Sequence, residues 1–184
     1  MAGWDDRSTL TLDSPGTAVR GVDARKLLDQ VEYMSQGVPV GTVYKSAGTS
    51  INSGSGGTTY QNDPHLSFTA EAGEVIRITL EVVYDAGTVG DMKQRFLVPS
   101  GALFESTIFS YSTTAPAPLA SSSTAEVIGL PGAGAGVLVH FRLSATLFMS
   151  TTGGDVNWQW AQNAADATNT TVAKGGCLEY KRMA

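Results

Sequence analysis

The feature that most constrains the fold of this chain is an apolar pattern with a period of two residues. In residues 74–84 the chain reads Glu-Val-Ile-Arg-Ile-Thr-Leu-Glu-Val-Val-Tyr, and every second residue from Ile76 to Tyr84 is apolar. Successive side chains of a strand point to opposite sides of a sheet, so this pattern buries one face and exposes the other. The alternation returns in residues 137–149. The pattern predicts a mainly β chain whose function lies in a surface.

After residue 37 we expect about eight to ten short strands separated by Gly-rich turns, an arrangement typical of a sandwich. The predicted strands are 38–45, 65–70, 74–84, 92–98, 103–111, 124–130, 136–149, 156–162 and 176–183. Strands 65–70 and 74–84 are expected to pair around the turn at 71–73. Residues 46–63 are expected to form a loop or a weak edge strand, 112–123 a long surface loop and 166–171 a turn. Because no helices separate the strands, we predict an all-β, jelly-roll-like antiparallel β-sandwich.

Residues 1–37 differ from the rest and are predicted to form an extended N-terminal arm and one short helix. The helix is expected over 23–34, where apolar residues recur every three or four positions, with Asp23 as the N-cap and Gly37 ending it. This gives two parts, an attachment arm and helix (1–37) and a β-sandwich domain (38–184). The predicted attachment interface consists of Trp4, Leu10, Leu12, Leu27, Leu28 and Val31.

Composition excludes several classes of function. Of the 184 residues, 42% are hydrophobic, which is enough for a core, and only 16% are charged. The net charge is −5 and Lys and Arg do not cluster, so we expect no nucleic-acid partner. Cys177 is the one cysteine, which rules out an intrachain disulfide, and it is expected to be a small buried side chain. No apolar run is long enough for a bilayer and the first residues lack a signal-peptide pattern, so we expect no membrane partner and synthesis in a cytoplasm.

The sequence offers no catalytic constellation, and we predict no enzyme activity, no cofactor and no metal. His65 and His140 lack the spacing of a metal site, and we expect ordinary polar roles for both. Asp85 and Asp91 flank a Gly-containing turn and could hold Ca²⁺, but their spacing matches no known calcium loop and hydrogen bonding within the turn is the favoured explanation. A glycan-active enzyme would need clustered carboxylates in a groove, and the candidates are Glu105, Glu126 and Asp155.

Aromatic residues near the C-terminus are candidates for the core or for a subunit interface. Trp158 and Trp160 fall on one face of a predicted strand, and Tyr180 lies in the last strand. Their rings could form a sugar platform, a trimer interface or part of the core, and core packing is the favoured interpretation. In a trimeric sandwich both the core and the axis are apolar, so the pattern alone does not separate these two.

Two stretches resemble a family of small virion proteins from tailed bacteriophages, especially phages of actinobacteria. They are AGEVIRITLEVVYDAGTVGDMKQRFLVPSG (72–101) and WQWAQNAADATNTTVAKGGCLEYKR (158–182). The shared pattern is an aliphatic strand, a D-x-G-x-x-G-D turn, a basic-aromatic strand ending in VP-x-G, and a C-terminal hairpin. The helix at 23–34 is similar to the short attachment helix of such proteins.

The resemblance implies a virion structural protein at the surface of the particle. The leading hypothesis is a capsid decoration or minor capsid protein that docks through its N-terminal arm on the major capsid protein and forms a homotrimer through its β domain. The alternative is a minor tail or tail-fibre component that contacts tail proteins, with receptor (glycan) binding by the loops 46–63 or 112–123. The pattern does not decide between capsid and tail.

Overall fold

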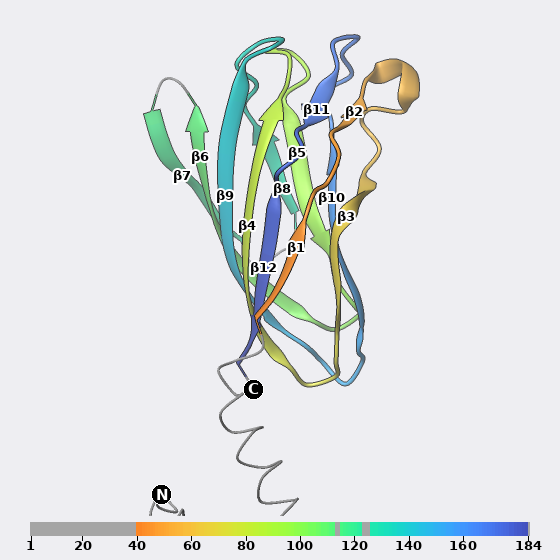
Figure 1. Ribbon diagram of the computed structural model, residues 1–184, viewed down its shortest axis with the longest axis vertical. Coiled ribbons are helices and arrows are strands. Elements are labelled where there is room, and N and C mark those ends of the chain that lie inside the picture. Colours follow the sequence, from red (N-terminus) through yellow and green to blue (C-terminus); the bar gives the residue numbers. More distant parts are fainter. Residues whose placement is uncertain (1–39, 113–114, 123–125, 184) are drawn as a thin grey trace, which may run out of the picture. The chain divides into compact units, whose positions relative to one another are not determined.

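The computed structural model describes residues 40–112, 115–122 and 126–183, and these form two antiparallel sheets packed face to face (Figure 1). The predicted all-β antiparallel sandwich is confirmed. The strands are β1 (Val40–Tyr44), β2 (Thr49–Ile51), β3 (Gln61–Ala70), β4 (Val75–Asp85), β5 (Met92–Leu97), β6 (Leu103–Ser112), β7 (Ala115–Ser122), β8 (Glu126–Leu130), β9 (Leu138–Phe148), β10 (Gly154–Ala161), β11 (Thr170–Val172) and β12 (Cys177–Arg182). One 3-10 turn, Ser53–Ser55, follows β2.

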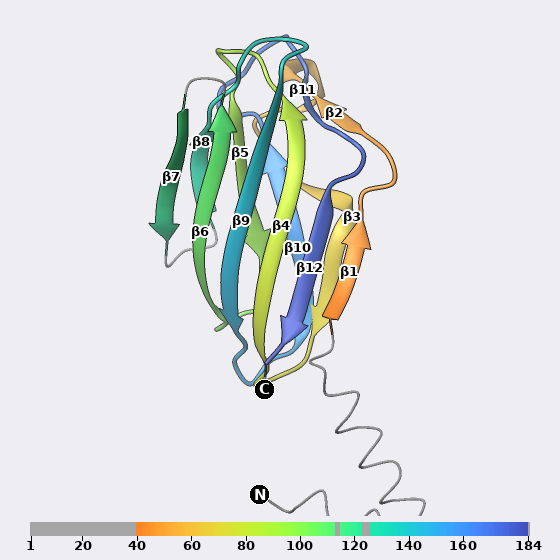
Figure 2. The same ribbon diagram turned by 60° about the vertical axis from the view of Figure 1, so that its left-hand side comes forward.

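The strand order is that of a jelly roll. The larger sheet runs β1-β12-β4-β9-β6-β7, with β11 pairing with both β4 and β2, and the smaller sheet runs β3-β10-β5-β8. When the β6–β7 hairpin is set aside, two four-stranded sheets remain and face each other, one in the order β1-β12-β4-β9 and the other in the order β3-β10-β5-β8. Most connections between consecutive strands cross from one sheet to the other. Two four-stranded sheets connected in this way define the jelly roll. The hairpin extends the larger sheet beyond β9 (Figure 2).

The core lies between the sheets and follows the period-two pattern. In β4 the residues from Ile76 to Tyr84 on the predicted face are buried, and β9 buries every second residue from Val139 to Leu147. Val137 lies on the same predicted face but is exposed, because it precedes the strand in a turn. From the smaller sheet, Trp158 and Phe96 complete the core against Phe141 and Phe104.

The predicted pairing of residues 65–70 with 74–84 is wrong. β3 pairs with β10 in the smaller sheet, whereas β4 pairs with β9, β11 and β12 in the larger one. The turn at 71–73 is an arch between the sheets, with Gly73 in the left-handed region at φ 78°. The C-terminal hairpin that the resemblance implies is also wrong, since β10 belongs to the smaller sheet and β11 pairs with β2 and β4 in the larger one.

The expected surface loop at 112–123 is also wrong, because its residues 115–122 form β7 and pair with β6. The segment reads as a loop because it contains Pro116 and Pro118, which cannot donate backbone hydrogen bonds. In this sheet β7 is an edge strand, where a missing donor is tolerated. The predicted turn at 166–171 similarly runs into the short strand β11.

Residues 46–63 contain both of the expected elements, a loop and the weak edge strand β2, and β3 begins at Gln61 rather than at 65. The predicted arm, the helix at 23–34 and the whole attachment interface lie outside the described residues.

Candidate functional site

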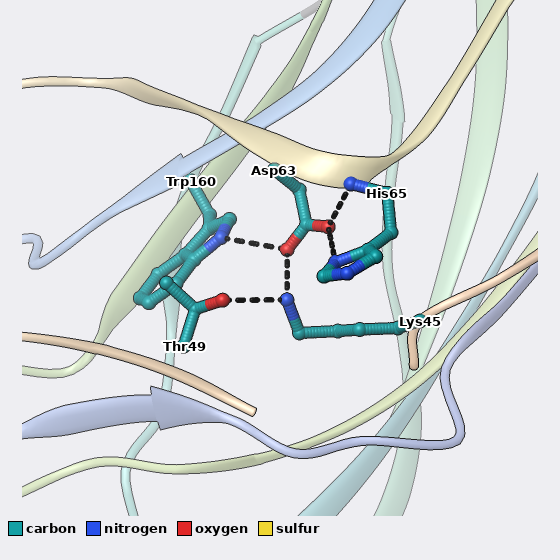
Figure 3. Close-up of polar contacts among 5 residues, drawn as sticks. All are labelled: Lys45, Thr49, Asp63, His65 and Trp160. Carbon is teal, nitrogen blue, oxygen red and sulfur yellow. Dashed lines mark hydrogen bonds and ion pairs between the residues drawn. The ribbon is translucent and has the colours of Figure 1, made fainter. Parts of the chain in front are cut away.

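A buried polar cluster links the segment after β1 in the larger sheet to β3 in the smaller one (Figure 3). Lys45 directly follows β1, and its backbone is held by the turn before β12, where Lys45 N–H donates to the Gly176 carbonyl at 2.8 Å. Its side chain runs inward, and Nζ lies 2.5 Å from Oδ2 of Asp63 in β3. Both side chains have no exposed surface, so a full ion pair lies out of contact with bulk water.

Each polar atom of the Lys45–Asp63 pair has further partners. Nζ of Lys45 also donates to Oγ1 of Thr49 at 2.8 Å, and Trp160 Nε1 donates to Oδ2 of Asp63 at 3.4 Å. The second carboxylate oxygen, Oδ1, accepts the backbone N–H of His65 at 3.1 Å. Nδ1 of His65 lies 3.7 Å from the same oxygen, too far for a hydrogen bond. We refer to these five residues as the buried cluster.

A buried ion pair of this kind is not an efficient way to stabilise a sandwich. Removing two charges from water costs several kcal/mol per ion, and well-packed apolar side chains often do as well or better. The buried cluster therefore calls for a chemical explanation as well as a structural one.

The two aspartates considered for Ca²⁺ bind backbone amides instead. Asp85 Oδ2 accepts the N–H of Gly136 at 2.9 Å, and Asp91 Oδ1 accepts the N–H of Gly132 at 2.8 Å. Thus the D-x-G-x-x-G-D turn anchors the Gly-rich turn at 131–136. Within the part of the chain that the structure describes, no group of three or more His, Cys, Asp or Glu side chains is placed to hold a metal ion.

A third loop joins this end of the sandwich through Asp166. Its Oδ1 accepts the N–H of Thr168 at 2.9 Å and its Oδ2 the N–H of Gly90 at 3.2 Å. These hydrogen bonds, that of Thr168 above all, hold the pKa of Asp166 below its usual value. The three loops 85–91, 131–136 and 162–168 are thus held together by carboxylate-to-amide bonds, and we call them the loop end.

The opposite end of the larger sheet carries an exposed apolar row. On the outer face, Leu103 of β6 is opposite Phe148 of β9, and Phe148 is opposite Val75 of β4. Met183 adjoins them through its backbone N–H, which donates to the Val75 carbonyl at 2.7 Å. Leu103, Phe148 and Met183 are 46%, 39% and 51% exposed. We call the four residues Val75, Leu103, Phe148 and Met183 the apolar row.

Among the described residues, the outer face of the smaller sheet carries several polar side chains beside the ring of Tyr60. Arg95 and Lys93 of β5 lie over the ring of Tyr60, at 4.2 and 4.8 Å from its centroid. Arg95 Nε donates to Gln159 Oε1, and Gln159 Nε2 donates to Asn62 Oδ1, both at 2.6 Å. The result is a polar ladder across β5, β10 and β3.

The aromatic candidates occupy two environments. Trp158 and Trp160 lie side by side in the core of the single chain, with their ring centroids 6.5 Å apart. Trp158 Nε1 donates to Oε1 of the buried Gln94 at 2.9 Å. Neither ring face is available to a sugar. Tyr180 is half-buried and stacks on Phe68 with centroids 4.2 Å apart.

Other candidates are separated in space. Glu105 and Asp155 are exposed on different sheets, so these two do not converge in a groove, and the side chain of Glu126 lies outside the described ones. His65 lies inside β3 rather than at its start and belongs to the buried cluster, whereas His140 is half-buried on the outer side of β9. Cys177 is half-buried rather than buried as expected, because the first residue of β12 lies on the outer face. Its partial burial and, to a lesser degree, the negative charges of Glu179 and Glu81 raise the pKa of its thiol.

Sequence reasoning singled out His65 and Trp160 but did not bring them together with Lys45 and Asp63. Lys45 ends a predicted strand and Asp63 ends a predicted loop, so both read as surface residues. The available signal was weak: His65 and Asp63 are two residues apart, which puts them on one side of a strand.

Comparison with known proteins gives only distant similarity. No protein-family model matches the chain, and no curated protein matches it. Among solved structures, the chain is similar to "Structure of infectious bursal disease virus Gt strain", with 11% identity, a TM-score of 0.26, and coverage of 81% of this chain and 38% of that chain. It is also similar to "Crystal structure of infectious bursal disease virus VP2 subviral particle", with 14% identity, a TM-score of 0.25, and coverage of 79% and 38%. The chain thus spans less than half the length of these proteins.

The structure also bears on membrane association. Across the described residues, no helix has the length and apolar character needed to span a bilayer.

Proposed function

We propose that this protein is a structural component of a virus particle, most specifically a bacteriophage capsid decoration or minor capsid protein. The observation that carries the proposal is the apolar row, an exposed apolar surface at one end of the jelly roll. Jelly rolls recur in viral capsid domains. The sequence resemblance to small phage virion proteins points the same way.

In this proposal the β domain forms a homotrimer and the residues 1–37 attach it to the major capsid protein. Burial of Leu103, Phe148 and Met183 between copies would contribute roughly 25 cal/mol for each Å² of apolar surface removed from water. Three attachment segments on one trimer bind the same particle together, so weak individual contacts add up through avidity. The result is a protein that cements a lattice.

The test is size-exclusion chromatography with light scattering, followed by co-sedimentation with undecorated capsids and with tails. We expect a trimer that pellets with capsids, and loss of pelleting when residues 1–37 are deleted. The double variant Leu103→Ser/Phe148→Ser should be monomeric. Leu138→Ser is the matched control, because Leu138 is an exposed leucine at the other end of β9 and should leave the trimer intact. A wild-type monomer that binds neither capsids nor tails contradicts the proposal.

A minor tail or tail-fibre component that binds a receptor glycan is the second candidate. The supporting observation is the polar ladder with Tyr60, because sugars bind to amide and guanidinium groups beside an aromatic ring. Pelleting with tails instead of capsids, together with glycan binding that Tyr60→Ala abolishes, would favour this function.

A further inference from the structure

We propose that Lys45 and Asp63 form an intramolecular isopeptide bond, an amide between Nζ of Lys45 and Cγ of Asp63. This inference concerns the buried cluster alone and does not depend on the proposed virion function. It assigns a covalent modification to a pair that otherwise would be a costly buried ion pair.

The geometry brings the reacting atoms together. Nζ is 2.5 Å from Oδ2, so Cγ lies at most one carbon–oxygen bond further from the nitrogen. Both side chains are fully buried, and Nζ is aimed by its hydrogen bond to Thr49 Oγ1 at 2.8 Å (Figure 3). Holding two groups in reacting contact replaces a bimolecular encounter by an intramolecular step, which is among the largest rate effects known.

The proton balance closes within the pair. One proton passes from the Lys45 ammonium to Oδ2 of Asp63, which leaves a neutral amine and a neutral acid. The lone pair of Nζ then attacks Cγ, and the electrons of the Cγ–Oδ1 double bond move to Oδ1. A second proton passes from Nζ to Oδ2, the Cγ–Oδ2 bond breaks, and Oδ2 leaves as water while the carbonyl re-forms at Oδ1. No oxidant, reductant or external reactant is needed.

The other residues of the buried cluster stand at the oxygens whose charge changes. Negative charge develops on Oδ1, which already accepts the backbone N–H of His65 at 3.1 Å, and the His65 imidazole lies 3.7 Å away, where an imidazolium would stabilise that charge. Trp160 Nε1 holds the leaving oxygen Oδ2 at 3.4 Å. Donors fixed in advance around a developing oxyanion lower the barrier to attack at a carbonyl carbon.

Burial also favours the product. The ion pair loses the hydration of two charges, whereas the amide is neutral and the released water returns to solvent. The bond would join the end of β1 in the larger sheet to β3 in the smaller one, across 18 residues of chain. It would close the loop 46–62 covalently and clamp the sheets together.

The first measurement is the intact mass of the denatured full-length protein. We expect the folded wild-type chain to be lighter than its sequence by one water molecule, and Lys45→Arg to have its full mass. Lys174→Arg is the matched control: Lys174 is an exposed lysine, so this variant should keep the deficit. A folded wild-type chain with the full mass overturns the proposal, whether or not Lys45→Arg folds.

Proteolysis locates the bond. In the wild-type protein trypsin should fail to cleave after Lys45, and chymotryptic cleavage after Tyr60 should leave a branched peptide containing both residues. His65→Ala should slow the appearance of the mass deficit in freshly folded protein. Cleavage after Lys45, or a deficit located elsewhere, contradicts the assignment.

Discussion

The loop end depends on a close approach that can be tested with one methyl group. A Cβ added at Gly132 would lie 2.4 Å from the carbonyl oxygen of Gly87 and 2.5 Å from that of Ala86. Both obstacles are backbone atoms, so no side-chain rotation relieves them. Gly132 also donates its N–H to Asp91 Oδ1 at 2.8 Å, and any shift of the 131–136 turn weakens that bond.

From this geometry we expect Gly132→Ala to lower the free energy of unfolding by about 3–5 kcal/mol. Forcing extra volume into a packed site costs roughly 1–3 kcal/mol, and a hydrogen bond to a charged group contributes about 1.5–3 kcal/mol. Small domains are stable by only about 5–15 kcal/mol, so a loss of this size removes a large fraction of the free energy of unfolding.

The assay is urea denaturation of the full chain followed by the fluorescence of the buried Trp158 and Trp160. Gly48→Ala is the matched control, because its added Cβ meets nothing closer than 3.6 Å and should change the unfolding free energy by less than about 1 kcal/mol. If Gly132→Ala unfolds within about 1 kcal/mol of the wild type, the reasoning about the loop end is refuted.

Three further predictions concern other parts of the sandwich. Asp166→Asn should lower the free energy of unfolding at neutral pH, because a carboxyl whose pKa is lowered on folding contributes stability only while it is ionised. The difference in unfolding free energy between variant and wild type should therefore shrink as the pH falls below 3.8. Urea denaturation at a series of pH values measures this difference. Cys177 should be alkylated more slowly than an unhindered thiol at neutral pH, with half-maximal reactivity above pH 9.0, since burial disfavours its thiolate; a normal rate would contradict this. Leu80→Ala should cost about 2–5 kcal/mol and Leu138→Ala less than about 0.5 kcal/mol, because only Leu80 is fully buried; equal urea midpoints would refute the assignment of the core face.

Features set by local periodicity could be predicted from the sequence, and features set by strand exchange between sheets could not. The buried side of β4 follows from the alternation alone, because every second side chain of the strand packs against the same apolar core. The pairing around residues 71–73 was wrong because a hairpin and an arch between sheets use similar Gly-containing turns. β7 was missed because its prolines exclude a central strand but not an edge strand.

The candidate sites divide in the same way. Asp85 and Asp91 stand out in the sequence, but their partners, the amides of Gly136 and Gly132, are more than forty residues away along the chain. Lys45 and Asp63 carry no pattern at all, and only the packing of β1 against β3 makes them a buried pair. Charged residues at strand ends are ordinarily solvated, so a sequence gives no reason to pair them.

The apolar row and the loop end are separated along the strands of the sandwich. β4 runs from Val75 in the apolar row to Asp85 at the loop end, so these features lie at opposite ends of the same strands. β1 starts near the apolar row, because Val40 is opposite Lys181 and Lys181 is opposite Arg77. The first described residue, Val40, therefore lies at the end of the sandwich that carries the apolar row, whereas carboxylate-to-amide hydrogen bonds hold the loop end together. In the proposed trimer the apolar row lies between copies, so we expect substitutions in that row, and not at the loop end, to change the oligomeric state.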